Sequence, residues 1–335
     1  MTGRPASFVR FLAIGTTLVS APLRAQGTAS ADPLPVPSWA FPTTSPDAPA
    51  LKAPFDSIVL LHVPTSRKSY TMAQVKNQNA PPDWYPAAHP PVPEPVAHGR
   101  VGAMMACGYC HLPDGQGRTE NATLAGLPAE YMMRQLDDLK TRARRGALDS
   151  WASTANMHRV ADSVTQNEAL AASRYFARIK AKPRFHVVEG AEVPVTYQAG
   201  LLYAVKPGAG TEPLGQRIIE VADDVQRHEL RDAKATYTAY VPAGSIVSGK
   251  RLATVKEKVP LRACASCHGP ALLGVGQVPP IAGRSPTYLF RQLLAFRNGT
   301  RAATTSAPMQ SVAASLSLDE MIAVVAYAGS LRPSR

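Results

Sequence analysis

The four cysteines of this 335-residue chain fall into two copies of one short motif. Residues 107–111 read CGYCH and residues 264–268 read CASCH, so each copy has the form C-x-x-C-H. Each copy offers two thiols for thioether links to haem vinyl groups and an adjacent imidazole for the iron. A zinc site would need four ligands per ion, and a thioredoxin-like dithiol has a βαβ context and no adjacent histidine. The motifs predict two covalently attached c-type haems. The thioether cysteines would be Cys107, Cys110, Cys264 and Cys267, with His111 and His268 as iron ligands.

The motifs belong to an internal repeat with an offset of 157 residues. Tyr131, Arg134 and Gln135 fall on Tyr288, Arg291 and Gln292, and beyond a shorter loop the offset becomes 152. There, T-x-x-E at 165–168 falls on S-x-x-E at 317–320, and both read as capping boxes that open a helix. We therefore expect one helical module used twice, with helices at the motif, after an Ala-Gly turn and at the end.

The middle helix of each module carries an apolar stripe at positions i, i+4 and i+7. The stripe residues are Met132, Leu136 and Leu139 in the first copy and Leu289, Leu293 and Phe296 in the second. One face should therefore meet an apolar interior. Arg134 and Arg291 recur beside the stripes, and we expect them near haem propionates. Pro286 suits the first turn of its helix, where its missing amide would be unpaired anyway.

Met157 and Met309 are the candidates for the second axial position on each iron. They occupy equivalent positions at the shorter offset, in what the sequence indicates is a loop before a capped helix. A thioether favours ferrous iron, raises the reduction potential and closes the iron to small molecules. His158 stays open as an alternative to Met157 and would give a bis-histidine haem of lower potential.

Other methionines and histidines have weaker claims as ligands. We expect Met104, Met105, Met132 and Met133 within helices and Met321 as a packing residue of the last helix. The histidines outside the modules are expected at the surface or in turns, and these are His62, His89, His98, His186 and His228.

Residues 107–179 and 264–331 resemble class I cytochrome c domains, on the motif, the Ala-Gly turn, the Tyr-x-x-Arg-Gln-Leu helix and the late methionine. Two such domains in tandem resemble diheme cytochrome c4. The resemblance implies a periplasmic protein that passes single electrons between redox enzymes and a terminal acceptor. It also implies His/Met ligation, with Cys107, Cys110, His111 and Met157 at one haem and Cys264, Cys267, His268 and Met309 at the other. It covers less than half of the chain, and a proline-rich segment and a long insert depart from the family.

We divide the chain into five segments. These are a signal peptide (1–31), a Pro-rich extended arm (32–99), cytochrome c domain 1 (100–182), a β-rich insert (183–249) and cytochrome c domain 2 (250–335). Arg4 and Arg10 flank or precede an apolar run at 11–23, and a small-residue cleavage site follows at 29–31. The run has 13 residues, too few for a bilayer core of about 30 Å. We expect an exported, soluble periplasmic protein with no membrane span after cleavage.

The arm and the insert have different compositions. The arm holds nearly half of all prolines, which favours an extended segment, and we expect it to wrap the body. Residues 58–63 are a candidate strand, and Trp84 with Tyr85 a candidate anchor on a cytochrome module. The insert alternates in hydrophobicity at 185–188, 201–205, 217–221 and 237–241, which predicts a small antiparallel β element. The fold class is thus mainly α, with two helical haem domains joined by this insert.

The chain is basic, with a formal charge of +12 that falls to +9 without the leader arginines. A basic face can steer an acidic redox partner into a short-lived encounter. The densest run is Lys140, Arg142, Arg144 and Arg145, for which a solvated helix end is the alternative interpretation. We expect no nucleic-acid partner.

These observations favour an electron-transfer protein rather than an enzyme, with a donor and an acceptor such as a dehydrogenase and a terminal oxidase. A diheme peroxidase would need an open iron site, which the paired methionines disfavour. A thiosulfate dehydrogenase-like enzyme would need a cysteine as distal ligand, and none is left over. The electron-accepting cytochrome subunit of a dehydrogenase complex stays open beside a free shuttle.

Overall fold

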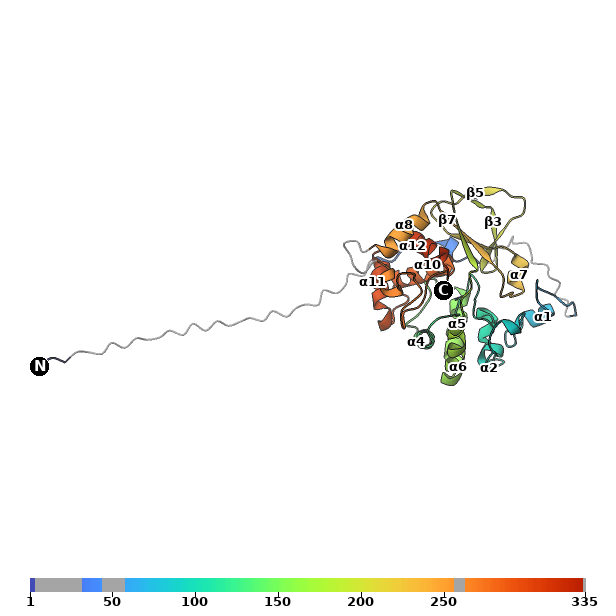
Figure 1. Cartoon of the computed structure of the whole chain (residues 1–335), viewed down its shortest axis with the longest axis horizontal. Coiled ribbons are helices and arrows are strands. Elements are labelled where there is room, and N and C mark those ends of the chain that lie inside the picture. Colours follow the sequence, from blue (N-terminus) through green and yellow to red (C-terminus); the bar gives the residue numbers. More distant parts are fainter. Residues whose placement is uncertain (4–31, 44–57, 256–262, 334–335) are drawn as a thin grey trace. The chain divides into compact units, whose positions relative to one another are not determined.

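The computed structural model describes residues 1–3, 32–43, 58–255 and 263–333. The expected signal peptide lies outside these residues, apart from the first three. From residue 31 onward the chain clusters as one unit, so arm, modules and insert pack together rather than forming separate bodies. Figure 1 shows the order of the elements along the chain.

The first module contains four helices, one more than expected. They are α3 (Cys107–His111), α4 (Ala129–Lys140), α5 (Ala152–Ser163) and α6 (Gln166–Ala177). The capping box of α6 is confirmed, because the Thr165 side chain accepts from Glu168 N while the Glu168 side chain accepts from Thr165 N. Helix α4 packs against both α5 and α6. Apolar side chains of α4 and α6 form part of the hydrophobic core of this module.

The second module repeats this plan with an added helix in front. It comprises α8 (Ser245–Thr254), α9 (Ala265–His268), α10 (Pro286–Arg297), the 3-10 turn η3 (Thr304–Ser306), α11 (Ala307–Ala314) and α12 (Leu318–Ser330). Ser317 and Glu320 form the second capping box, and Pro286 opens α10, both as expected. Helix α12 is the core helix and lies against α8 at Gly249, where an added Cβ would come within 1.9 Å of Ala323 O.

Two expectations about the methionines were wrong. Met157 and Met309 lie on α5 and α11 rather than in loops. Residues 152–163 contain no Gly or Pro, and Pro308 sits in the first turn of α11, where a missing amide is tolerated, so both segments can close helical hydrogen bonds despite their polarity. Met104 and Met105 lie outside helices, because α3 begins only at Cys107 and Met104 instead forms a bridge with Arg100.

The insert forms a mixed sheet rather than an antiparallel one. Its five strands follow the order β1-β7-β6-β4-β3. They are β1 (Phe185–Gly190), β3 (Thr196–Ala199), β4 (Leu202–Val205), β6 (Ile219–Ala222) and β7 (Tyr237–Pro242), while β2 (Glu192–Pro194) pairs separately with β5 (Thr211–Pro213). The β1–β7 and β4–β6 pairs are parallel. Alternating hydrophobicity marks a half-buried strand in either direction, so the sequence pattern could not distinguish the two pairings.

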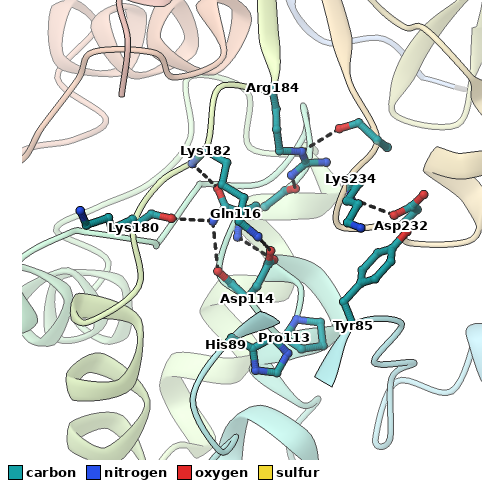
Figure 2. A network of polar contacts seen from close by, with 12 residues as sticks. Tyr85, His89, Pro113, Asp114, Gln116, Lys180, Lys182, Arg184, Asp232 and Lys234 are labelled. Carbon is teal, nitrogen blue, oxygen red and sulfur yellow. Dashed lines mark hydrogen bonds and ion pairs between the residues drawn. The ribbon is translucent and has the colours of Figure 1, made fainter. Parts of the chain in front are cut away.

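A polar network joins the first module to the insert (Figure 2). Gln116 donates from Nε2 to Lys180 O at 2.9 Å and accepts from Lys182 N at 2.8 Å. Lys182 Nζ also pairs with the buried Asp114 carboxylate at 3.1 Å. Arg184, just before β1, donates to Gly117 O at 2.6 Å and to Ala235 O at 2.7 Å. The loop after the first motif is thereby fixed to the insert.

The arm packs against other parts of the chain, but it is not uniformly extended. It contains η1 (Ser38–Ala40), α1 (Met72–Val75), η2 (Pro86–Ala88) and α2 (Glu94–Ala97). Trp39 contacts Phe290 of the second module, with ring centroids 4.6 Å apart, and Phe41 contacts Trp151 of the first, at 5.4 Å. The arm therefore wraps the body, as expected.

The anchor and the strand predicted within the arm need correction. Trp84 Nε1 donates to Leu230 O at 2.6 Å, so the anchor sits on the insert rather than on a cytochrome module. Its neighbours in this small core are Val63, Met72, Val75 and Leu230. Residues 58–60 are exposed, and the expected strand is reduced to a bridge between Leu61 and Tyr70.

Two histidines expected at the surface or in turns have buried side chains, although His89 does lie in a bend. His228 lies on α7 (Val225–Glu229), is 1% exposed and has its Nδ1 3.1 Å from Tyr237 Oη. The His89 side chain is 2% exposed and lies between Asp83 and Tyr175. Their positions outside the repeat gave no sign of the partners that the insert and the arm supply.

Within the described ranges, no single helix is long and apolar enough to cross a bilayer. One bent pair, Thr304–Ala314 with Leu318–Ser330, meets the length and composition criteria together across a bend of 113°.

Glu220 of β6 links the insert to the second module. Its carboxylate is 4% exposed and accepts from Ser285 Oγ at 2.7 Å and from Thr287 N at 3.2 Å, at the first turn of α10. Burial raises the pKa of Glu220 from 4.5 to about 7, against the lowering effect of these hydrogen bonds. The buried carboxylate therefore makes stability depend on pH.

We predict that Glu220→Gln removes a loss of stability between pH 4.5 and 7. Below pH 4.5 the carboxyl is neutral in both folded and unfolded chains; above it the unfolded chain ionises first, so the free energy of unfolding falls until the folded carboxyl ionises near pH 7. The wild type should lose at most about 3 kcal/mol relative to Glu220→Gln across this interval. Urea unfolding at pH 4.5 and 8 measures the difference, with the exposed Glu192→Gln as control. Identical pH profiles for wild type and Glu220→Gln would contradict the prediction.

A candidate haem-binding cavity

Both C-x-x-C-H motifs open onto one cavity of about 560 Å³. Its wall includes all four cysteines, His111 and His268, together with Met157 and Met309. The apolar stripes of α4 and α10 face it as expected, and their residues are Met132, Leu136, Leu139, Leu289, Leu293 and Phe296. The tertiary structure thus brings every predicted site residue of both modules to a single cavity.

Each motif histidine is held by one ring nitrogen. His111 Nδ1 lies 2.8 Å from Ala122 O, and His268 Nδ1 lies 2.7 Å from Pro279 O, in both cases eleven residues along the chain. A carbonyl accepts only from a protonated Nδ1, so Nε2 keeps its lone pair for a metal. Burial lowers the pKa of both histidines, which keeps the rings neutral. This arrangement fits an axial iron ligand.

Cys107 and Cys264 are neutral thiols rather than thiolates before any link to haem forms. Burial raises the pKa of Cys107 to about 12 and that of Cys264 to about 11, so both thiols stay protonated at neutral pH. Nucleophilic and metal-binding cysteines show the opposite shift. Among the described residues there is no cluster of three or more His, Cys, Asp or Glu side chains that could hold a metal ion.

The two candidates for the first module's second axial position differ in their surroundings. Met157 lies in the cavity wall, whereas His158 is not part of it. His158 Nε2 instead lies 3.0 Å from Arg144 O. This geometry favours Met157, and the ligand assignment itself stays a prediction.

A reciprocal exchange of arginines between the modules was not predicted from the sequence. Arg144 of the first module donates to Tyr288 Oη at 3.2 Å and to Gln292 Oε1 at 3.1 Å in the second. Arg301, its equivalent at the offset of 157, donates to Tyr131 Oη at 3.0 Å and to Gln135 Oε1 in the first module. Backbone bonds from Arg145 N to Thr300 O and from Ala302 N to Ala143 O, both 2.7 Å, run alongside. The repeat offset of 157 was the sequence signal that could have revealed this exchange, because it makes the residues of one module equivalent to those of the other.

The basic residues at 140–145, a candidate docking surface, therefore do not lie together on one exposed face. Arg144 belongs to the module interface rather than to an exposed face, which corrects the expectation for this residue. Arg142 donates to Leu139 O at 2.8 Å at the end of α4 and pairs with Asp162 at the surface. The interpretation as a helix end holds for Arg142.

Six arginines in the cavity wall have no carboxylate salt bridge among the described residues, and these are Arg134, Arg144, Arg145, Arg284, Arg291 and Arg301. Arg284 donates to the Thr123 and Ala125 carbonyls, and burial lowers its pKa to about 10. The Nε atoms of Arg284 and Arg301 are buried without a hydrogen-bond partner. Arg134 and Arg291, singled out from the sequence, also line the cavity. Buried cations with unused donors match the carboxylates of haem propionates, so the residues present fit the group.

Comparison with known proteins agrees with the site. Residues 247–332 match the family model for cytochrome c. The thiosulfate dehydrogenase electron acceptor of Stutzerimonas stutzeri is 29% identical over 68% of this chain and 80% of its own length. Cytochrome c4 of Azotobacter vinelandii is 24% identical over 68% of this chain and 84% of its own. Thiosulfate dehydrogenase from Marichromatium purpuratum, a solved structure, aligns with 25% identity and a TM-score of 0.45 over 68% of this chain and 37% of that one.

The family match places residues 247–332 among the cytochromes c, whose cofactor is covalently bound haem and whose role is electron transfer. Over both modules the chain is similar to cytochrome c4, as its motifs and internal repeat predicted.

We predict that Arg144→Met and Arg301→Met each destabilise the protein by about 1–3 kcal/mol, because buried amide and phenol groups lose their donors. The double variant should lose more than the sum, since both guanidinium groups bond the same Gln135 and Gln292 oxygens and each single variant leaves these oxygens one donor. Urea unfolding of the four proteins measures the coupling. Arg142→Met, at the surface, is the control and should change stability little. Strictly additive losses would contradict a shared network.

Proposed function

We propose that this chain is a periplasmic diheme c-type cytochrome that carries single electrons between redox partners through two His/Met-ligated haems. The main support for this proposal is a single cavity, whose wall contains the cysteines and histidines of both C-x-x-C-H motifs and two equivalent methionines. The expected signal peptide supports export, and two attachment motifs support two haems.

Under this proposal, the residues of the cavity wall have separate roles in attaching haem and in binding iron. Cys107, Cys110, Cys264 and Cys267 form the thioether links, His111 and Met157 bind one iron, and His268 and Met309 bind the other. When bound, haem supplies a one-electron ferric/ferrous couple. The Ala122 and Pro279 carbonyls orient the two imidazoles. The apolar stripes exclude water, and the buried arginines hold the propionates.

Electron transfer is favoured over catalysis by the ligand sets. With a histidine and a methionine on each iron, no coordination position is left for a substrate such as peroxide. The wall of the cavity also contains no cysteine beyond the four of the motifs. A peroxidase or a thiosulfate dehydrogenase-like chemistry therefore has no assigned residues here.

We infer that the electron donor is a dehydrogenase. One similar protein bears the name thiosulfate dehydrogenase electron acceptor, and the match extends over 80% of it. A terminal oxidase or another oxidant downstream would take the electron onward. Mixing the purified cytochrome with such a dehydrogenase and its substrate, and following haem reduction optically, tests the donor; no reduction would reject it.

The primary test is the haem content and ligation of the purified exported protein. We expect two haems per chain by the pyridine haemochrome assay and a methionine-to-iron charge-transfer band in the far-red spectrum of the oxidised form. Carbon monoxide should not bind the reduced protein. One haem per chain, or stoichiometric carbon monoxide binding, would refute the proposal.

We predict that Met157→Ala and Met309→Ala each remove about half of the far-red band and open one iron to carbon monoxide, with a lower potential at that iron, because the soft thioether is lost. Met133→Ala is the matched control, since Met133 lies on α4 outside the cavity wall. His158→Ala should leave the band unchanged. If His158→Ala, rather than Met157→Ala, opens the first iron, bis-histidine ligation replaces our assignment.

A further inference from the structure

The two C-x-x-C-H motifs are covered by different parts of the chain. The first motif lies under the arm, because α2 packs against α3 and an added Cβ on Gly108 would come within 2.6 Å of Val96 O. The arm also accepts a backbone bond from Ala106 N at Gln78 O, 2.9 Å long. Glycine at this position lets the arm approach the motif closely.

The insert covers the same motif from another direction. The Arg231 guanidinium stacks 3.5 Å from the centre of the Tyr109 ring and donates from Nη1 to Tyr109 O at 2.6 Å. Its Nε donates to Val75 O of the arm at 3.1 Å. The neighbouring Leu230 is held by Trp84, so arm and insert meet at Arg231 over the first motif.

Within the described ranges, neither the arm nor the insert covers the second motif in this way. Ala265 and Ser266 stand where the first motif has Gly108 and Tyr109, so no aromatic ring is available for stacking. Ser266 and Cys267 are exposed, whereas Cys110 is only partly accessible. Among the described residues, no hydrogen bond joins the arm or the insert to residues 264–268.

The charges around the first motif do not cancel. Arg118 pairs with Glu120, whose side chain is buried, while that of Arg118 is partly exposed. His228 nearby is neutral, because burial holds its pKa well below 6.5. Arg231 has no carboxylate salt bridge in the described part of the chain, and although burial lowers its pKa to about 10, it remains protonated at pH 7. Arg231 therefore leaves a net positive charge beside Cys110.

We propose that Arg231 is a positioning residue that makes the two haem sites inequivalent: it seals the first motif with Tyr109 and stabilises the reduced form of the first haem, giving that haem the higher reduction potential. A nearby cation disfavours the extra positive charge of ferric iron. The haem that His111 and Met157 would hold would then be the stronger one-electron acceptor, and the haem that His268 and Met309 would hold the stronger one-electron donor. This inference rests on the proposed diheme function.

The test is a redox titration of the purified holoprotein, resolved into two steps. Met309→His labels the second haem by moving its step to lower potential. In that background we expect Arg231→Gln to shift the remaining step, that of the first haem, to lower potential. Arg217→Gln, an insert arginine paired with Glu212 at the surface, is the matched control and should shift neither step.

Arg231→Lys separates charge from packing, because it keeps the cation and loses the planar stack. We expect the first potential to stay close to the wild-type value, while amide hydrogen exchange speeds up in residues 106–111 of both Arg231 variants and not in residues 264–268. An unchanged first step in Arg231→Gln, or equal shifts of both steps, would overturn the role of Arg231. If Met309→His moves neither step, the ligand assignment fails instead, and the two failures are thereby distinguished.

Discussion

The exchange of Arg144 and Arg301 between the two modules is the interaction on which the rest of the structure depends. A buried guanidinium is costly unless its donors are used, and each of these two bonds a phenol and an amide oxygen of the opposite module as well as the glutamine of its own module. Separating the modules would leave each guanidinium with only the glutamine bond of its own module. The modules therefore face each other, and their motif histidines, stripes and methionines line one cavity.

The arm and the insert make this symmetrical core asymmetrical. Glu220 and the arm residue Trp39 reach the second module at α10, whereas Arg184 and Arg231 of the insert reach the first at its haem-attachment loop and motif. Among the residues that the structure describes, the arm and the insert enclose the first motif and not the second. A repeat whose sequence predicts two equal sites is thus given unequal surroundings by segments that lie outside the repeat.

Local chemistry in the sequence predicted local structure well. Thr165 with Glu168, Ser317 with Glu320, and Pro286 were interpreted correctly because caps and first turns are decided by residues three or four positions apart. Expectations failed where the partner is distant. The polar helix around Met157 is stabilised by its packing on α4. His228 is buried against Tyr237, and Trp84 donates a hydrogen bond to Leu230 of the insert.

The sequence by itself determined the cofactor chemistry and the twofold repeat, since two C-x-x-C-H motifs and a fixed offset need no folded structure to be recognised. The tertiary structure decided that β1 and β7 run parallel, that Arg144 points inward and that the two sites share one cavity. Strand direction and the partner of a buried charge depend on contacts between segments far apart in the chain, which hydrophobic periodicity does not encode.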